Sequence, residues 1–169
     1  MTTFRRIAFD PGGATGWATY TSQVDAAGKH TDVKWLCGTF DWEDHHKDLY
    51  NMCEEQRVQN YKVITESFEF RQFDKVQRAG IELISKEYIG VLRCYGQIEG
   101  VPIIQQTAAS AKKFMPDKGP MANKHLRVMG LWVPGRDNRH AMDAYRHLVF
   151  YLVNKDRLFD IVESWKDLV

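Results

Sequence analysis

Residues 7–18 read IAFDPGGATGWA, and this stretch decides the fold of the chain. A short apolar run ends on Asp10, Pro and Gly interrupt it, and a second apolar run follows. The pattern predicts a strand, a tight turn and a second strand, with Asp10 at the tip of the first strand. A carboxylate beside a Gly-rich turn can bind a hard metal ion or face a phosphate. Asp10 could also serve only to start the turn, because Asp, Pro and Gly are common turn residues.

The remainder of the chain alternates between strand and helix patterns. Residues 74–95 show the clearest helical pattern, with apolar side chains recurring at spacings of three and four. Three leading strands followed by alternating helices and strands predict a single α/β domain with a mixed sheet. The expected strands are 6–10, 17–20, 33–40, 62–66 and 101–105, and the expected helices are 48–60, 74–95, 107–114, 122–131, 138–153 and 157–168.

Composition points to an ordinary globular chain. The sequence has 169 residues, of which 44% are hydrophobic and 27% charged, enough for one domain with a full core. No apolar run approaches the roughly 20 residues of a membrane span, and the N-terminus does not resemble a signal peptide. Three scattered cysteines suggest free thiols in a reducing compartment. We therefore expect a cytoplasmic protein, in the host cytoplasm if its source is viral, without membrane contact.

Charge is unevenly distributed although the formal net charge is only +1. Residues 41–55 contain six acids and one lysine, whereas residues 110–140 contain seven bases and two acids. This separation is consistent with a positive face that binds nucleic acid. Two solvated faces of opposite sign would explain the same pattern.

Four side chains could converge on one site. Asp10 and Glu66 each end a predicted strand, and open α/β sheets place their sites at such carboxyl ends. His140 and Asp143 are three residues apart, hence on one face of a predicted helix. Oxygen donors with one imidazole suit Mg²⁺ or Mn²⁺. Each residue also has an ordinary explanation, such as a surface charge or an interaction with the helix dipole.

Two further residues near this group receive no definite role. Asp137 precedes the helix and is a secondary candidate for a metal ligand, although an Asp at such a position more often serves as a turn or capping residue. His147 lies four residues after Asp143, and we expect it to be an ordinary structural histidine. Asn138 is expected to cap the helix that begins at this point.

Four segments together resemble the RuvC-type Holliday junction resolvases of the RNase H-like nuclease superfamily. FDPGGATGWA resembles the opening motif of the family, and VITES resembles the second motif, which ends in a metal-binding Glu. TAASAKKF resembles the basic stretch before the last helix, and RHAMDAYRH resembles the closing motif. The resemblance implies an RNase H-like mixed five-stranded sheet flanked by helices in residues 1–153. Residues 154–169 form a C-terminal helical tail without a counterpart.

The resemblance also implies a reaction. Its metal-binding catalytic set would be Asp10, Glu66, His140 and Asp143, with His140 standing where many relatives have an acid. The implied enzyme is a structure-specific endonuclease that cleaves branched DNA, such as Holliday junctions, during recombination and repair. It would use two Mg²⁺ ions, for which Mn²⁺ can substitute, with Asp10 bridging the ions. His140 would position or deprotonate the attacking water.

DNA contacts and a partner follow from the same resemblance. An aromatic side chain after the second motif would stack at the opened junction, with Phe70 as the first candidate and Phe68 as the second. The apolar surface of helix 74–95, on more than one stripe, suits a homodimer interface. Basic side chains would contact phosphates, namely Lys112, Lys113, Lys124, Arg127 and Arg139.

Three other functions compete with this interpretation. A related nuclease acting on forks, flaps or RNA–DNA hybrids could use the same four ligands, because ligands do not define substrate shape. A non-catalytic DNA-binding module is a second alternative, although an intact set of acids argues against it. A sugar kinase or actin-like ATPase is the third, but such proteins need two lobes and 169 residues are too few.

Overall fold

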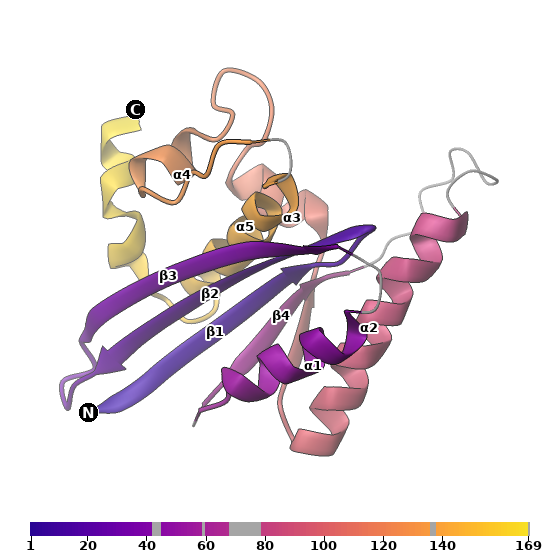
Figure 1. Cartoon of the computed structure of the whole chain (residues 1–169). Coiled ribbons are helices and arrows are strands. Elements are labelled where there is room, and N and C mark those ends of the chain that lie inside the picture. The colour runs from indigo at the N-terminus through magenta and orange to yellow at the C-terminus, as the bar shows by residue number, and fades with distance from the viewer. Residues whose placement is uncertain (42–44, 59, 68–78, 136–137, 169) are drawn as a thin grey trace.

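The computed structural model describes residues 1–41, 45–58, 60–67, 79–135 and 138–168. Its centre is a five-stranded sheet in the order β3-β2-β1-β4-β5 (Figure 1). The strands are β1 Thr2–Asp10, β2 Ala14–Val24, β3 His30–Asp41, β4 Lys62–Glu66 and β5 Ile103–Gln106. β2 pairs antiparallel with both β1 and β3, whereas β4 pairs parallel with both β1 and β5. The predicted α/β fold with a mixed five-stranded sheet is confirmed.

Helices cover both faces of the sheet (Figure 1). One face carries α1 and α2, which run over His46–Glu55 and Ala79–Glu99. The other face carries α3, α4 and α5, which run over Ala108–Phe114, Lys124–Val128 and Arg139–Asn154. A 3₁₀ helix, η1, at Phe159–Leu168 packs against α4 and α5.

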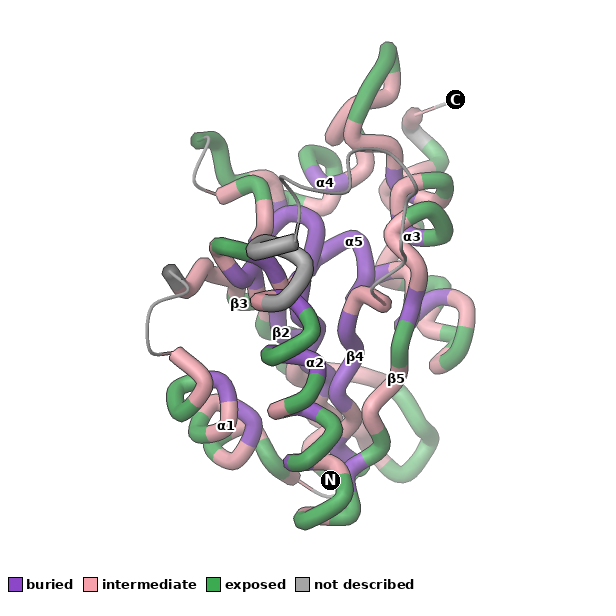
Figure 2. The backbone as a smooth tube through the Cα atoms, turned by 90° about the vertical axis from the view of Figure 1, so that its right-hand side faces the viewer, coloured by how far each residue is buried: buried purple, intermediate pink, exposed green. Residues whose placement is uncertain are grey.

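Each face of the sheet has its own hydrophobic core, because successive side chains of a strand point to opposite faces. Ile7 and Phe9 pack with the core beneath α1 and α2, and Ala8 packs with the core beneath α5. Figure 2 shows α5 as a largely buried helix, whereas α1 and α2 are exposed on one side. The alternation places Asp10, two residues after Ala8, on the face that α5 covers.

Parallel pairing brings two strand ends to one edge. The last aligned pair of β1 and β4 is Phe9 with Thr65, so the next residues of the two strands are Asp10 and Glu66. The last aligned pair of β4 and β5 is Glu66 with Gln106. Three polar side chains therefore meet where the carboxyl ends of three strands lie side by side.

Several predicted boundaries differ from the structure. The first three strands are longer than expected, because hydrogen bonding between antiparallel neighbours continues through polar stretches such as Thr19 to Gln23. Asn138 does not cap α5 with its side chain and instead donates a hydrogen bond from Nδ2 to the Pro134 carbonyl at 2.8 Å. The last helix is a 3₁₀ helix that begins at Phe159. Within the described residues, no helix is long and apolar enough to cross a membrane.

Gly16 permits the closest contact between a helix and the sheet. A Cβ atom at Gly16 would lie 2.0 Å from the carbonyl carbon of His140 and 2.5 Å from the amide nitrogen of Ala141. Backbone atoms of the first turn of α5 therefore occupy the space that any other side chain would need. The turn between β1 and β2 thereby sets the position of His140.

We predict that Gly16→Ala destabilises the protein by about 3 kcal/mol, because the added methyl group displaces the start of α5. Urea unfolding monitored by circular dichroism measures this loss. Gly13→Ala, in the turn just before β2, is the matched control, because a Cβ atom at Gly13 meets nothing within 4 Å. Equal effects of the two substitutions would contradict the proposed role of Gly16.

Candidate active site

Asp10 and His140 form the first contact of the site. Asp10 is buried at the end of β1, and His140 lies in the first turn of α5. The Nδ1 atom of His140 is 2.8 Å from the Oδ2 atom of Asp10. Burial raises the pKa of Asp10 to about 6, the hydrogen bond with His140 opposes this rise, and the charges of Glu66 and Asp143 add to it. The hydrogen bond to Asp10 raises the pKa of His140, partly offset by burial.

Glu66 has a different partner. The Nε2 atom of His147, from the middle of α5, is 3.1 Å from the Oε2 atom of Glu66. The Nδ1 atom of the same ring is 3.1 Å from the Oε1 atom of Gln106 on β5. Burial by itself raises the pKa of Glu66, but the hydrogen bond and charge of His147 outweigh it and lower the pKa below its ordinary value.

Asp143 is held by two basic side chains. The Nη1 atom of Arg146 is 2.6 Å from the Oδ1 atom of Asp143, and the Nζ atom of Lys112 is 3.1 Å from its Oδ2 atom. Arg146 is buried and also donates to the Met115 carbonyl and to the Asn123 side chain. Burial lowers the pKa of Lys112, but the charges of Asp143 and nearby Asp117 raise it above its ordinary value.

Each carboxylate engages at least one nitrogen from another side chain. The charges of Glu66 and Asp143 nevertheless raise the pKa of Asp10, in addition to its burial. Among the described residues, no three His, Cys, Asp or Glu side chains form a preassembled metal cluster. Three wholly or partly buried acids thus lie at one edge of the sheet, and His140, His147 and Arg146 each form a hydrogen bond with one of them. A bound cation could replace or supplement these hydrogen bonds.

The four residues predicted as a catalytic set thus lie around one edge of the sheet. Of the predicted DNA contacts, Lys112 is turned toward Asp143, while four others are exposed on the same side of the sheet. The guanidinium of Arg127 lies 4.8 Å from the centre of the Trp132 ring. Phe68, Phe70 and Asp137 lie outside the described residues. The exposed basic residues are Lys113, Lys124, Arg127 and Arg139.

Sequence reasoning missed three residues around the acids. Arg146 contacts Asp143, His147 contacts Glu66, and Gln106 contacts His147. A signal for His147 was present, because it lies seven residues after His140 and four after Asp143, on one face of the helix. Gln106 ends a strand beside Glu66, in the same way that Asp10 and Glu66 end theirs. Arg146 lies three residues after Asp143 on the same helix, which was a local signal for that pair. Its other partners, Met115 and Asn123, come from the chain segment between α3 and α4 and carried no such signal.

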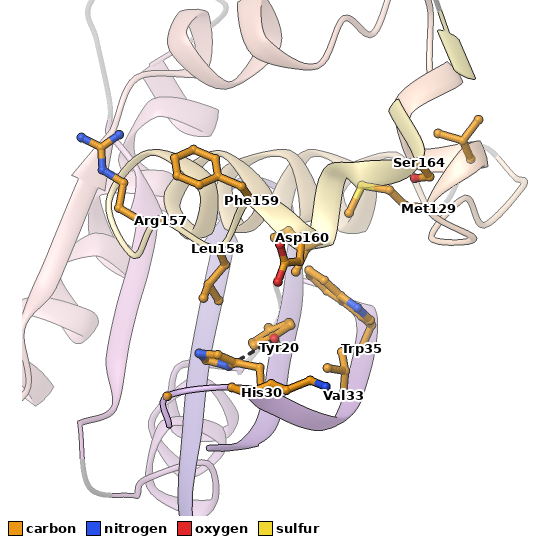
Figure 3. Close-up of a pocket in the computed structure, with 14 residues that line it drawn as sticks. Tyr20, His30, Val33, Trp35, Met129, Arg157, Leu158, Phe159, Asp160 and Ser164 are labelled. Atoms are coloured by element: carbon orange, nitrogen blue, oxygen red, sulfur yellow. Dashed lines mark hydrogen bonds between the residues drawn. The ribbon is translucent and has the colours of Figure 1, made fainter. Parts of the chain in front are cut away.

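A separate cavity lies toward the opposite end of the strands. It has a volume of about 560 Å³ and lies between the β2–β3 hairpin, the end of α4 and the segment leading into η1. Figure 3 shows Asp160 pointing into it, opposite Tyr20 and His30. The Nδ1 atom of His30 is 2.7 Å from the Ser22 hydroxyl. None of the acids at the strand tips lines this cavity.

Comparison with known proteins places the fold. No protein-family model matches the chain, and no curated protein matches it in sequence. Two solved structures of Thermus thermophilus RuvC match 88% of the chain, with TM-scores of 0.57 and 0.59 and identities of 18% and 16%. These matches cover 95% and 94% of the RuvC chains, and the second structure is a complex with a Holliday junction substrate.

A viral structure matches over the same share of the chain. The fowlpox virus Holliday junction resolvase has a TM-score of 0.51 and 11% identity, with 88% of this chain and 98% of that chain covered. This chain has the RuvC fold. The RNase H-like architecture expected from the four motifs is therefore confirmed by structure, at identities that are too low to transfer a function.

We predict that the metal-free protein loses about 1–2 kcal/mol of stability between pH 5 and pH 8. The pKa of Asp10 is raised from 3.8 to about 6, so the folded state binds more protons than the unfolded state in this range. The raised pKa of His140 acts in the same direction above pH 6.5. Stability must therefore fall as the pH rises.

Urea unfolding in EDTA at several pH values measures this slope, and Asp10→Asn is the informative variant. The substitution removes the Asp10 titration and the charge that raises the pKa of His140, so we expect the stability to fall less between pH 5 and pH 8 than in the wild type. Parallel profiles for the wild type and the variant would contradict the assignment.

Proposed function

We propose that this protein is a metal-dependent endonuclease that cleaves branched DNA, with Holliday junctions as the preferred substrate. The observation that carries the proposal is the meeting of Asp10, Glu66 and Asp143 with His140 at the strand tips of a RuvC fold. Asp10 is buried beside the charges of Glu66 and Asp143, which disfavours its ionised form, and a bound cation would relieve this. The solved structures of similar fold, including one holding a Holliday junction, support the choice of substrate.

The donor set fits Mg²⁺, or Mn²⁺ in its place, because it consists of carboxylate oxygens with one imidazole. We propose Asp10, Glu66, Asp143 and His140 as the residues that would hold two ions. When bound, the ions would supply a nucleophilic water and stabilise charge on the leaving 3′ oxygen. The pKa of Asp10, raised mainly by burial and further by the charges of Glu66 and Asp143, supports this assignment.

The side chains of the protein would prepare the reaction in two ways. His140 lies in the first turn of α5, and its side chain is partly exposed to solvent. It would orient the attacking water or accept a proton from it. The Lys112 ammonium, 3.1 Å from Asp143 and also near Asp117, balances the charge of the acids before DNA arrives. In the complex, Lys112 is placed to move from Asp143 to the scissile phosphate.

The DNA backbone would lie across the face formed by α3, α4 and the start of α5. Lys113, Lys124, Arg127 and Arg139 are exposed on these elements and can each neutralise a phosphate. Phe70 and Phe68 remain the proposed stacking residues. We also propose a homodimer, because resolution of a junction needs two symmetric cuts. Sedimentation at micromolar concentration that shows only a 19.7 kDa species would exclude the dimer.

We predict that Asp10→Asn abolishes Mg²⁺-dependent cleavage of a four-way junction, with a loss of at least about 10³-fold, but retains junction binding. The amide keeps the shape of the side chain while removing the charge that would hold the ions. Cleavage is measured on denaturing gels, and binding is measured by fluorescence anisotropy in Ca²⁺. Retained cleavage in this variant would overturn the proposed site.

A panel of substrates tests the preference for junctions. The wild type is compared on a four-way junction, a fork, a flap, an RNA–DNA hybrid and a linear duplex of matched sequence. Preferred cleavage of the junction supports a resolvase. Preference for a fork, flap or hybrid would keep the nuclease but replace the substrate, and equal cleavage of the linear duplex would argue against structure specificity.

We predict that Lys113→Ala weakens junction binding and reduces the salt dependence of the binding constant by about one counterion. The side chain is exposed on α3 and would neutralise one phosphate. The control is Lys34→Ala, because Lys34 is exposed on β3 at the face covered by α1. Binding isotherms at several salt concentrations give both slopes, and identical slopes for the two variants would contradict the proposed DNA surface.

A further inference from the structure

We propose that His147 is a positioning residue that fixes the Glu66 carboxylate for metal binding. The inference rests on the proposed function, because it assigns a role to Glu66 as a ligand. His147 is buried completely, so it cannot reach DNA or bulk water itself. Its ring nevertheless contacts Glu66 through Nε2, at 3.1 Å. Any influence of His147 on a reaction must therefore pass through Glu66.

The register of β4 and β5 positions Glu66 for its contact with His147. Glu66 and Gln106 are aligned partners on the parallel strands β4 and β5, so their side chains project from the same face. α5 crosses this face, and the His147 ring bridges the two side chains, with one ring nitrogen on each. The amide nitrogen of Ser67 also donates to the Gln106 carbonyl at 2.6 Å, which ties the ends of the two strands together.

Hydrogen bonding to both ring nitrogens leaves the imidazole no freedom to rotate. An ionised carboxylate is only an acceptor, so the Nε2 atom must carry a hydrogen toward Glu66. Gln106 faces Nδ1 from the other side with its Oε1 atom. Such an outer partner fixes the orientation of a ligand. Here the ring holds the Oε2 atom of Glu66, while the side chain keeps about a quarter of its surface open toward the site (27%).

If His147 served only to fill the core, it would not need hydrogen bonds to polar side chains. The surrounding core beneath α5 is apolar, and a phenyl ring of similar volume would fill the space without a polar atom. The buried imidazole instead meets two polar side chains, one of which belongs to the proposed metal-binding set. The geometry is that of a ligand held in place by a second side chain.

The test compares Mn²⁺ affinity in four variants, measured by electron paramagnetic resonance of the free ion. His147→Phe should weaken Mn²⁺ binding about 10–100-fold, the usual effect of removing an outer partner of a ligand. His147→Gln should restore most of the affinity, because its amide can donate to Glu66. In a Glu66→Gln background the His147→Phe change should alter affinity less than about twofold, because the carboxylate that His147 would orient toward the ion is already absent.

Tyr151→Phe is the matched control for damage to the helix. Tyr151 is buried one turn further along α5, and its hydroxyl accepts a hydrogen bond from Lys62 at 3.3 Å. We expect this variant to keep the Mn²⁺ affinity and cleavage rate of the wild type. Circular dichroism and urea unfolding identify variants that are folded, and His147→Gln provides the answer if His147→Phe does not fold.

The possible results separate the two proposals. Unchanged Mn²⁺ affinity in folded His147→Phe, or equal losses in the wild-type and Glu66→Gln backgrounds, would overturn the role of His147 alone. Failure of His147→Gln to bind more tightly than His147→Phe would also overturn it. A wild-type protein that neither binds Mn²⁺ nor cleaves branched DNA would overturn the proposed function, and this inference with it.

Discussion

The packing of α5 across the carboxyl ends of β1 and β4 and the start of β2 is the constraint on which the whole site depends. The helix reaches the sheet at Gly16, where any side chain would collide with the backbone of His140. From this anchor, one helical face carries His140 to Asp10 and, two turns later, His147 to Glu66. A shift of α5 by the width of a methyl group would therefore disturb both contacts together.

The burial of acids at this edge of the sheet lowers the stability of the free protein, while it provides the charge that is proposed to bind metal. Asp10 has its pKa raised to about 6 because it is buried near Glu66 and Asp143, which is unfavourable for folding near neutral pH. Hydrogen bonds from ring and guanidinium nitrogens offset part of this cost, and Arg146 ties Asp143 to the segment between α3 and α4. Such tension is common in binding sites, where the charge that a ligand needs destabilises the free protein.

The motifs located the acids because strand ends and helical spacing are local properties. Asp10 and Glu66 stand where apolar runs end, and His140 and Asp143 are one turn apart, so their placement followed from backbone periodicity. The partners of these acids could not be found in this way. His147 was read as an ordinary structural histidine, and Lys112 as a phosphate contact, because their interactions join residues from different elements.

The sequence by itself determined the α/β architecture, the mixed sheet and the residues that end its strands, because these depend on the alternation of apolar and polar side chains along the chain. Only the tertiary structure decided which nitrogen faces which carboxylate. It set Gln106 beside Glu66 through the register of β4 and β5, and it set His147 across both through the position of α5. Those contacts depend on the distance between a helix and a sheet, which is decided by packing at residues such as Gly16 rather than by any local pattern.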